Sequence, residues 1–276
     1  MNANRPIGIF DSGVGGLSVV RAIRELMPQE NLLYFGDQGH IPYGPRPMEQ
    51  IRKFSEAITN FLLAGQAKIT VVACNTASAA ALKYLRERFR DLKFVGMEPA
   101  VKPAAEHTRT GKVGVLATPA TFQGELYGSV VERFANGVEI FQSTCPGLVQ
   151  QIERGNLESV DTRRILMEAL QPMIEKNIDT VVLGCTHYPF VIPLIQQIVG
   201  ENVRVIDPAP AVAKQTKRLL EAGGIANQLP ARGTIRMFTS GDPVALESML
   251  PILLGESSKV EKIEWVGDSR ISRSRS

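Results

Sequence analysis

The feature that most constrains the fold is a regular alternation of short apolar runs with longer segments of helical periodicity. Apolar runs of this length, rich in β-branched residues, predict strands, and the periodic segments between most of them predict helices. Strands joined through helices pair in parallel, so the sequence predicts an α/β protein with mostly parallel sheets. The runs are PIGIF, NLLYF, ITVVA, LKFVG, KVGVLA, VEIF, DTVVLG, VRVID, TIRMF and VEKIEW.

Two pairs of segments in the chain echo each other. ITVVACNT at 69–76 and TVVLGCTH at 180–187 both place a cysteine after a strand and a small residue, and the cysteines lie 185 − 74 = 111 positions apart. PIGIFDS at 6–12 and KVGVLAT at 112–118 are related with a separation of 114 − 8 = 106 between their matching glycines. The similar separations predict two related α/β units with similar half-sites.

Two X-Pro steps predict where these units meet, because the residue before a proline avoids helical backbone. They are Glu98-Pro99 and Asp207-Pro208. We predict two pseudo-symmetric, doubly wound (flavodoxin-like) domains with the active site in the cleft between them. The expected domains are residues 1–97 plus 208–265 and residues 98–207, followed by a disordered, basic tail at 266–276.

The cysteines Cys74 and Cys185 both follow predicted strands. Ligands of open parallel sheets bind at such strand ends, beside helix N-termini. Asn75 or Thr76 can cap the helix after Cys74, and the helix end favours the ionised thiolate. Each thiol can therefore act as nucleophile, metal ligand or proton-transfer base, and the alternative for one such cysteine alone is a small buried apolar residue. The three cysteines form no C-x-x-C pair, and we expect free thiols.

The stretch DSGVGGLS follows the first predicted strand and begins with Asp11 and Ser12. Its glycines allow a ligand to approach the backbone. Asp11 can orient or tune a neighbouring catalytic group, and it can also cap the following helix. A dinucleotide-binding loop is disfavoured because Ser18 occupies the third glycine position and the Asp11 carboxylate would repel a pyrophosphate.

His187 lies two residues after Cys185 and is a candidate for a second proton-transfer or orienting group. A structural histidine is the alternative. His40 and His107 have no such neighbour in sequence, and we expect both to be surface or loop residues.

Polar groups elsewhere can hold a substrate. The loop HIPYGPRP at 40–47 is stiffened by prolines around Tyr43 and Gly44, and its backbone N–H groups can bind a carboxylate. A merely rigid connector is the alternative reading of this loop. Thr118 and Thr121 occupy the strand end that echoes Ser12, and their hydroxyls suit an amino or carboxylate group.

Two thiols in similar half-sites fit racemisation better than other reactions. One thiolate removes a proton from a stereocentre, and the other thiol returns a proton on the opposite face. The roles of the two groups exchange with the direction of the reaction, which is a chemical reason for the two half-sites to look alike.

The motifs DSGVGG, PYG, ACNTA and GCTHYP occur in this order over nearly the whole chain. With them the sequence resembles the bacterial glutamate racemases of the aspartate/glutamate racemase superfamily. The resemblance implies a cofactor-independent enzyme that interconverts L- and D-glutamate and supplies D-glutamate for peptidoglycan. It implies no metal, a homodimer, and, because the chain starts at its first strand, no regulation by a cell-wall precursor through an N-terminal extension.

The resemblance also implies roles for individual residues. Cys74 and Cys185 are the proton donor and acceptor, with helper roles for Asp11 beside Cys74 and His187 beside Cys185. Glu153 matches a further acidic helper position, with an exposed helix residue as the alternative, and Cys145 stays structural. Residues implied to contact or organise the substrate are Asp11, Ser12, Tyr43, Gly44, Asn75, Thr76, Thr186 and His187.

Charge and hydropathy exclude other classes of protein. The 31 basic and 28 acidic residues are interspersed and give a net charge of +3, without the basic stripe of a nucleic-acid-binding protein. The N-terminus lacks the apolar region of a signal peptide, so we expect a cytoplasmic protein. Residues 181–200 carry no formal charge but contain two prolines, and they predict a strand and a short helix rather than a membrane span.

Three other functions remain open at this stage. A sister enzyme acting on aspartate, a hydantoin or maleate would differ mainly around the side-chain carboxylate. A gyrase-inhibiting binding protein is disfavoured by the weak net charge. A redox or metal role for the thiols is disfavoured because two cysteines and one histidine fall short of the four ligands of a structural zinc site.

Overall fold

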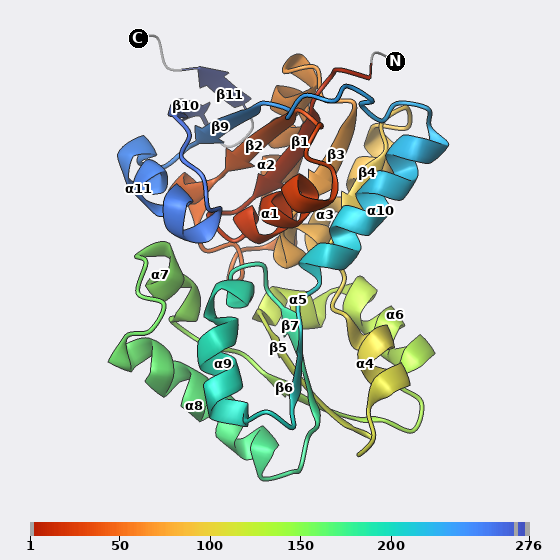
Figure 1. Ribbon diagram of the computed structural model, residues 1–276, viewed down its shortest axis with the longest axis vertical. Coiled ribbons are helices and arrows are strands. Elements are labelled where there is room, and N and C mark those ends of the chain that lie inside the picture. Colours follow the sequence, from red (N-terminus) through yellow and green to blue (C-terminus); the bar gives the residue numbers. More distant parts are fainter. Residues whose placement is uncertain (1–2, 268–269, 274–276) are drawn as a thin grey trace. The chain divides into compact units, whose positions relative to one another are not determined.

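The computed structural model describes residues 3–267 and 270–273, and its chain divides into two compact units (Figure 1). Residues 98–208 form the second unit, and the other described residues form the first. The first unit is therefore built from two separate parts of the chain.

The first unit is built on a seven-stranded sheet with the order β11-β10-β9-β2-β1-β3-β4. Neighbouring strands are parallel except β10 and β11, which are antiparallel. The strands are β1 (Ile7–Asp11), β2 (Leu32–Gly36), β3 (Ile69–Val72), β4 (Phe94–Gly96), β9 (Ile235–Thr239), β10 (Val260–Val266) and β11 (Arg270–Arg273).

Helices cover both faces of this sheet: α1 packs against α10 on one face and α2 against α3 on the other (Figure 1). Phe10 and Phe35 of the sheet pack with Phe54 and Ile58 of α2 in one buried cluster. Burial of each such side chain contributes about 1.5–3 kcal/mol to folding. The helices are α1 (Leu17–Leu26), η1 (Gln38–His40), α2 (Met48–Ala64), α3 (Asn75–Arg88), α10 (Ala209–Ala222) and α11 (Pro243–Leu253).

The second unit has a four-stranded, fully parallel sheet with the order β6-β5-β7-β8. Helices α8 and α9 pack together on one face, and α4 and α6 pack together on the other (Figure 1). The strands are β5 (Lys112–Ala117), β6 (Glu139–Ser143), β7 (Thr180–Gly184) and β8 (Arg204–Ile206). The helices are α4 (Val101–His107), α5 (Pro119–Gln123), α6 (Glu125–Phe134), α7 (Leu148–Glu153), α8 (Val160–Ile174), η2 (Tyr188–Val191) and α9 (Ile192–Val199).

The two sheets share one topology. In each, the first four strands along the chain take the order second, first, third, fourth, which is the flavodoxin-like order. The order reverses between β1 and β3 in the first unit and between β5 and β7 in the second. The predicted α/β class, the mostly parallel sheets and the internal relationship between the two halves are confirmed.

The predicted disordered tail at 266–276 is wrong for part of its length. Val266 is the last residue of β10, and residues 270–273 form β11, in which Ile271 pairs with Trp265. Ile271 is half-buried and packs against the core cluster of the first unit. A local pattern with a single apolar residue could not reveal this contact, and Arg275 lies outside the described residues.

Residues 181–200 fold as β7, η2 and α9, which agrees with the prediction of a strand and a short helix. Across the described ranges 3–267 and 270–273, every helix is too short or too polar to span a bilayer.

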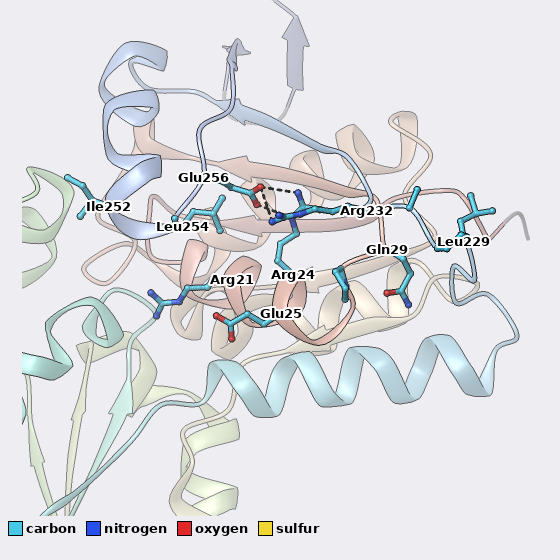
Figure 2. Close-up of a pocket in the computed structure, with 13 residues that line it drawn as sticks. Arg21, Arg24, Glu25, Gln29, Leu229, Arg232, Ile252, Leu254 and Glu256 are labelled. Atoms are coloured by element: carbon cyan, nitrogen blue, oxygen red, sulfur yellow. Dashed lines mark hydrogen bonds and ion pairs between the residues drawn. The ribbon is translucent and has the colours of Figure 1, made fainter.

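An ion pair joins helix α1 to the turn that follows α11. Figure 2 shows Arg24 and Arg232 both pointing at Glu256, at the edge of a cavity of about 730 Å³. Arg24 donates to both carboxylate oxygens of Glu256, at 2.9 and 3.1 Å, and to the carbonyl oxygen of Gly233 at 2.6 Å. The ion pair with Arg24 lowers the pKa of Glu256. The cavity lining contains none of the predicted site residues.

Candidate active site

Most of the predicted site residues follow the strands at the switch points of the two sheets, in what we call the first and second half-sites. Tyr43 and Gly44 lie instead in the loop between η1 and α2, and Glu153 lies on α7. In the first unit, β1 pairs with β3, and the N–H of Ala73 donates to the carbonyl oxygen of Phe10 at 2.8 Å. Asp11-Ser12 and Cys74-Asn75, at the carboxyl ends of β1 and β3, therefore lie side by side at this edge of the sheet. In the second unit Ala117 pairs with Gly184, which places Thr118 beside Cys185 in the same way.

Asp11 is fully buried and organises the turn before α1. Its Oδ2 accepts hydrogen bonds from the backbone N–H groups of Gly13, at 3.0 Å, and Gly16, at 3.1 Å. Gly16 is the N-cap residue of α1, and a Cβ there would lie 2.7 Å from the Cβ of Asp11. The carboxylate therefore stabilises the helix start from outside the cap position, which is compatible with a second role towards a neighbouring group.

Cys74 is itself the N-cap residue of α3, and the prediction that Asn75 or Thr76 caps this helix is wrong. Cys74 has extended backbone, and helical backbone begins at Asn75. Its Sγ accepts a hydrogen bond from the N–H of Ala77 at 3.4 Å and lies 3.8 Å from Ser12 Oγ. The thiol thus lies at the positive end of α3, where a thiolate is stabilised.

Asn75 carries a buried amide that makes no hydrogen bond within the described part of the chain. The residue is 2% exposed, and neither Oδ1 nor Nδ2 has a hydrogen-bond partner among the described residues. A buried polar group left unpaired costs about 1–3 kcal/mol, and native proteins rarely tolerate it. The amide next to Cys74 is therefore suited to bind a ligand with both donor and acceptor groups.

Tyr43 is buried, and its hydroxyl donates to Asp37 Oδ2 at 2.6 Å. Burial, together with the nearby Asp37 carboxylate, raises the pKa of Tyr43 well above 10, so the phenol stays protonated. Because its proton points to Asp37, the Tyr43 oxygen can only accept a hydrogen bond from another group. Asp37 directly follows β2 but was not among the predicted site residues.

The histidines outside the half-sites differ from each other. His40 ends η1, between β2 and α2, and is only partly exposed: its Nδ1 lies 3.0 Å from Asp37 Oδ2, and its ring stacks on Phe54 at a centroid distance of 4.1 Å. His107 is exposed at the end of α4, as expected.

In the second half-site, Cys185, His187 and Glu153 form a chain of contacts. Cys185 Sγ lies 3.9 Å from His187 Nδ1, and His187 Nε2 lies 2.6 Å from Glu153 Oε1. Burial alone would lower the pKa of His187, but the contacts with Cys185 and Glu153 outweigh it and raise this pKa well above 6.5. The Glu153 side chain, from α7, is only 12% exposed, so it is not the exposed helix residue left open by the sequence.

The threonines of the second half-site lie at helix starts or beside the thiol. Thr118 is the N-cap residue of α5, and its Oγ1 accepts from the N–H of Thr121 at 3.2 Å. The two hydroxyl oxygens are 2.9 Å apart. Thr186 is buried directly after Cys185. The ends of β5 and β7 are therefore followed by residues with hydroxyl groups, just as β1 and β3 are followed by Ser12 and Thr76 in the first unit.

Cys145 is buried in the second unit, near Cys185 and Tyr188. Burial, assisted by the charge of a Cys185 thiolate, raises the pKa of Cys145 to about 12. Cys145 therefore remains a protonated thiol at neutral pH, in keeping with a structural role. All three cysteines, which lie within the described ranges, are free.

We expect Glu153→Gln to lower the pKa of His187, because the amide cannot stabilise the imidazolium as a carboxylate does. In the wild type the raised pKa means that the His187 ring stays protonated up to a higher pH than an ordinary histidine does. The variant should lose the imidazolium at lower pH, and any limb of the kcat/KM profile that depends on it should move in the same direction.

The check is an NMR titration of the chain's three histidines, with the His187 signal assigned through His187→Asn. The exposed Glu158 provides the control, since Glu158→Gln should leave the His187 titration in place. An unchanged His187 titration in Glu153→Gln would contradict the ion pair.

Comparison with known proteins places the chain in a family. A model of the Asp/Glu/Hydantoin racemase family matches residues 15–216. The glutamate racemase of Ectopseudomonas mendocina is 49% identical over 255 residues, which cover 92% of this chain and 97% of that protein.

Two solved structures agree with this match. The Escherichia coli glutamate racemase, solved with L-glutamate and the activator UDP-MurNAc-Ala, has a TM-score of 0.83 at 35% identity and covers 95% of this chain and 100% of its own. The Francisella tularensis glutamate racemase, solved with D-glutamate, has a TM-score of 0.82 at 30% identity and covers 95% of this chain and 98% of its own. The chain therefore belongs to the Asp/Glu/hydantoin racemase family and is an amino-acid racemase.

Proposed function

We propose that this protein is a cofactor-independent glutamate racemase in which Cys74 and Cys185 are the proton-transfer pair. One observation carries the proposal: two free, buried thiols occupy equivalent strand ends, after β3 and after β7, in two sheets with the same strand order. Racemisation needs a base on one face of the α-carbon and an acid on the other, and two related half-sites supply such a pair.

The proposed reaction moves one proton at each thiol. The thiolate of one cysteine takes the α-proton, which breaks the C–H bond and forms an S–H bond. The other thiol gives its proton to the opposite face of the α-carbon and becomes the thiolate. The negative charge that develops at the α-carbon spreads into the α-carboxylate, where N–H groups at helix N-termini favour it.

The half-sites support their thiols with different groups. In the first half-site the buried Asp11 carboxylate belongs to the turn that precedes α1, and Ser12 lies next to Cys74. In the second half-site His187 contacts Cys185 and is held by Glu153. We propose Asp11 as the helper of Cys74, and His187 with Glu153 as the helpers of Cys185. The two reaction directions then depend on chemically different helpers.

Several groups suit a substrate with an ammonium and two carboxylates. The amide of Asn75 supplies a donor and an acceptor, and the Tyr43 oxygen is an acceptor for an ammonium. We propose that Gly44 contributes backbone contacts and that hydroxyls supply the remainder, from Ser12, Thr76, Thr118, Thr121 and Thr186. We propose glutamate as the substrate, which is supported by relatives named glutamate racemase that match almost the full chain and by two neighbours solved with its enantiomers. The product D-glutamate would serve peptidoglycan synthesis.

The test follows L-glutamate in heavy water with protein stripped of pyridoxal phosphate and metal. We expect the ellipticity to fall to zero while the α-proton NMR signal disappears, because each product molecule receives its α-hydrogen from solvent-exchanged thiol. Aspartate and a hydantoin, incubated in parallel, separate the sister enzymes. Glutamate would be refuted as the substrate if its ellipticity and α-proton signal stayed unchanged at an enzyme concentration that racemises aspartate or a hydantoin.

A further inference from the structure

The chain's single tryptophan, Trp265, lies on strand β10 and contacts Asp37, whose side chain binds residues of the loop at 40–47. Its Nε1 donates a hydrogen bond to Asp37 Oδ1 at 2.8 Å. Its ring lies edge-on to His40, at a centroid distance of 4.9 Å, and 5.3 Å from Phe54. Trp265 therefore contacts both Asp37 and the residue that opens the loop.

Asp37 is fully buried, and donors occupy both of its carboxylate oxygens. Oδ1 accepts from Trp265 Nε1 and from Ser240 Oγ at 2.6 Å. Oδ2 accepts from the Tyr43 hydroxyl at 2.6 Å and lies 3.0 Å from His40 Nδ1. An ionised carboxylate has about four acceptor positions, so these contacts leave it little freedom to rotate.

The two oxygens share His40 but otherwise contact different parts of the chain. Oδ1 accepts from Ser240, which follows β9, and from Trp265 of β10, whereas Oδ2 accepts from Tyr43 in the loop at 40–47. His40 Nδ1 lies 3.2 Å from Oδ1 and 3.0 Å from Oδ2. The backbone N–H of Asp37 also donates to the carbonyl oxygen of Asp11 at 2.9 Å. With the backbone held in this way, the Oδ1 donors determine where Oδ2 points, and Oδ2 determines the direction of the Tyr43 hydroxyl.

We propose that Trp265 is a positioning residue for substrate binding: it orients Asp37, which in turn holds Tyr43 and the loop at 40–47. The inference rests on the proposed function, in which Tyr43 and Gly44 contact the substrate. Trp265 does not touch the substrate. It acts through a carboxylate 228 positions away in the sequence.

Trp265→Phe separates this role from simple packing. Phenylalanine keeps an aromatic ring against His40 and Phe54 but removes the N–H that Asp37 Oδ1 accepts. We expect KM for both glutamate enantiomers to rise about fivefold, because a hydrogen bond to a charged group is lost from the support of the binding loop. We expect kcat to change little, since the thiols are unaffected, and the Tm to fall only slightly, since phenylalanine keeps most of the ring that packs against the core cluster.

A double-mutant cycle tests the route through Asp37. Tyr43→Phe removes the hydroxyl that Asp37 holds, so adding Trp265→Phe to this variant should cause no further rise in KM. Tyr84→Phe is the matched control: it removes another tyrosine-to-carboxylate hydrogen bond, to Glu56, between α3 and α2, and should leave KM unchanged. An unchanged KM in Trp265→Phe, or fully additive effects in the double variant, would overturn the proposal.

A second readout does not need activity. With one tryptophan, the 1H–15N spectrum contains one indole N–H signal, and Asp37→Asn and Tyr43→Phe should both shift it. An indole signal unmoved by Tyr43→Phe refutes the coupling even in a protein that does not racemise glutamate. An inactive wild type instead refutes the proposed function, and an active wild type with an unaffected Trp265→Phe variant refutes this inference alone.

Discussion

Replacing either Cys74 or Cys185 with serine is expected to lower kcat for glutamate racemisation by about 10³-fold in both directions. A serine hydroxyl is a far weaker acid than a thiol, so it neither ionises to act as the base nor releases its proton readily as the acid. Because each turnover uses both groups, the loss of one should stop the reaction whichever enantiomer is supplied. The rate is measured from the decay of ellipticity with each enantiomer.

Cys145 offers the matched control, because it is a buried cysteine of the same second unit as Cys185 but has no proposed part in proton transfer. Cys145→Ala should keep kcat close to the wild-type value. Far-ultraviolet circular dichroism and the Tm of all variants establish that the fold is retained. A serine variant at position 74 or 185 that racemises at the wild-type rate would rule out the two-thiol mechanism.

Replacing Glu30 with glutamine is expected to produce the largest loss of stability among our predictions. Lys68 Nζ lies 2.6 Å from Glu30 Oε2 and also donates to the carbonyl oxygen of Ala3, and both charged side chains are almost completely buried. Glu30 Oε1 accepts from the N–H of Asn227 at 2.8 Å, so this pair joins the N-terminal segment to the returning part of the chain. Glu30→Gln leaves the ammonium of Lys68 without its counter-ion.

Breaking a buried ion pair by removing one partner costs about 3–5 kcal/mol, and we expect about 3 kcal/mol here because glutamine still offers an acceptor. For a chain of this size that corresponds to a fall in Tm of roughly 6–12 °C. The exposed pair Lys53–Glu49 on α2 is the control, and Glu49→Gln should change the Tm little.

The Glu30→Gln, Lys68→Met double variant completes this test. Removal of both charges should be less damaging than the sum of the single replacements, because no charge is then left buried alone. A Tm for Glu30→Gln equal to that of Glu49→Gln would show that the buried pair makes no special contribution.

Local sequence signals determined the α/β class, the relationship between the two halves and the position of both thiols. Apolar runs and helical periodicity arise from contacts that every strand or helix of this kind must make, so they can be recognised without the rest of the chain. Cys74 and Cys185 were recognised because a polar group placed directly after a buried strand lies at the carboxyl edge of the sheet. Asp11 and His187 were recognised because each lies close in sequence to a strand end of this kind.

Only the tertiary structure shows which side chains lie in contact around these groups, and it brings Glu153, which the sequence alone left open as an exposed helix residue, against His187. The contact of Glu153 with His187 joins α7 to the end of β7, and Asp37 collects donors from η1, the loop at 40–47, the end of β9 and β10. β11 forms because Ile271 packs on a core made by distant residues. Glu153 lies 34 positions from His187, and Ser240 and Trp265 lie 203 and 228 positions from Asp37. Each of these positions alone has an ordinary sequence environment. Their roles follow from the packing of the sheets and helices, which local patterns do not encode.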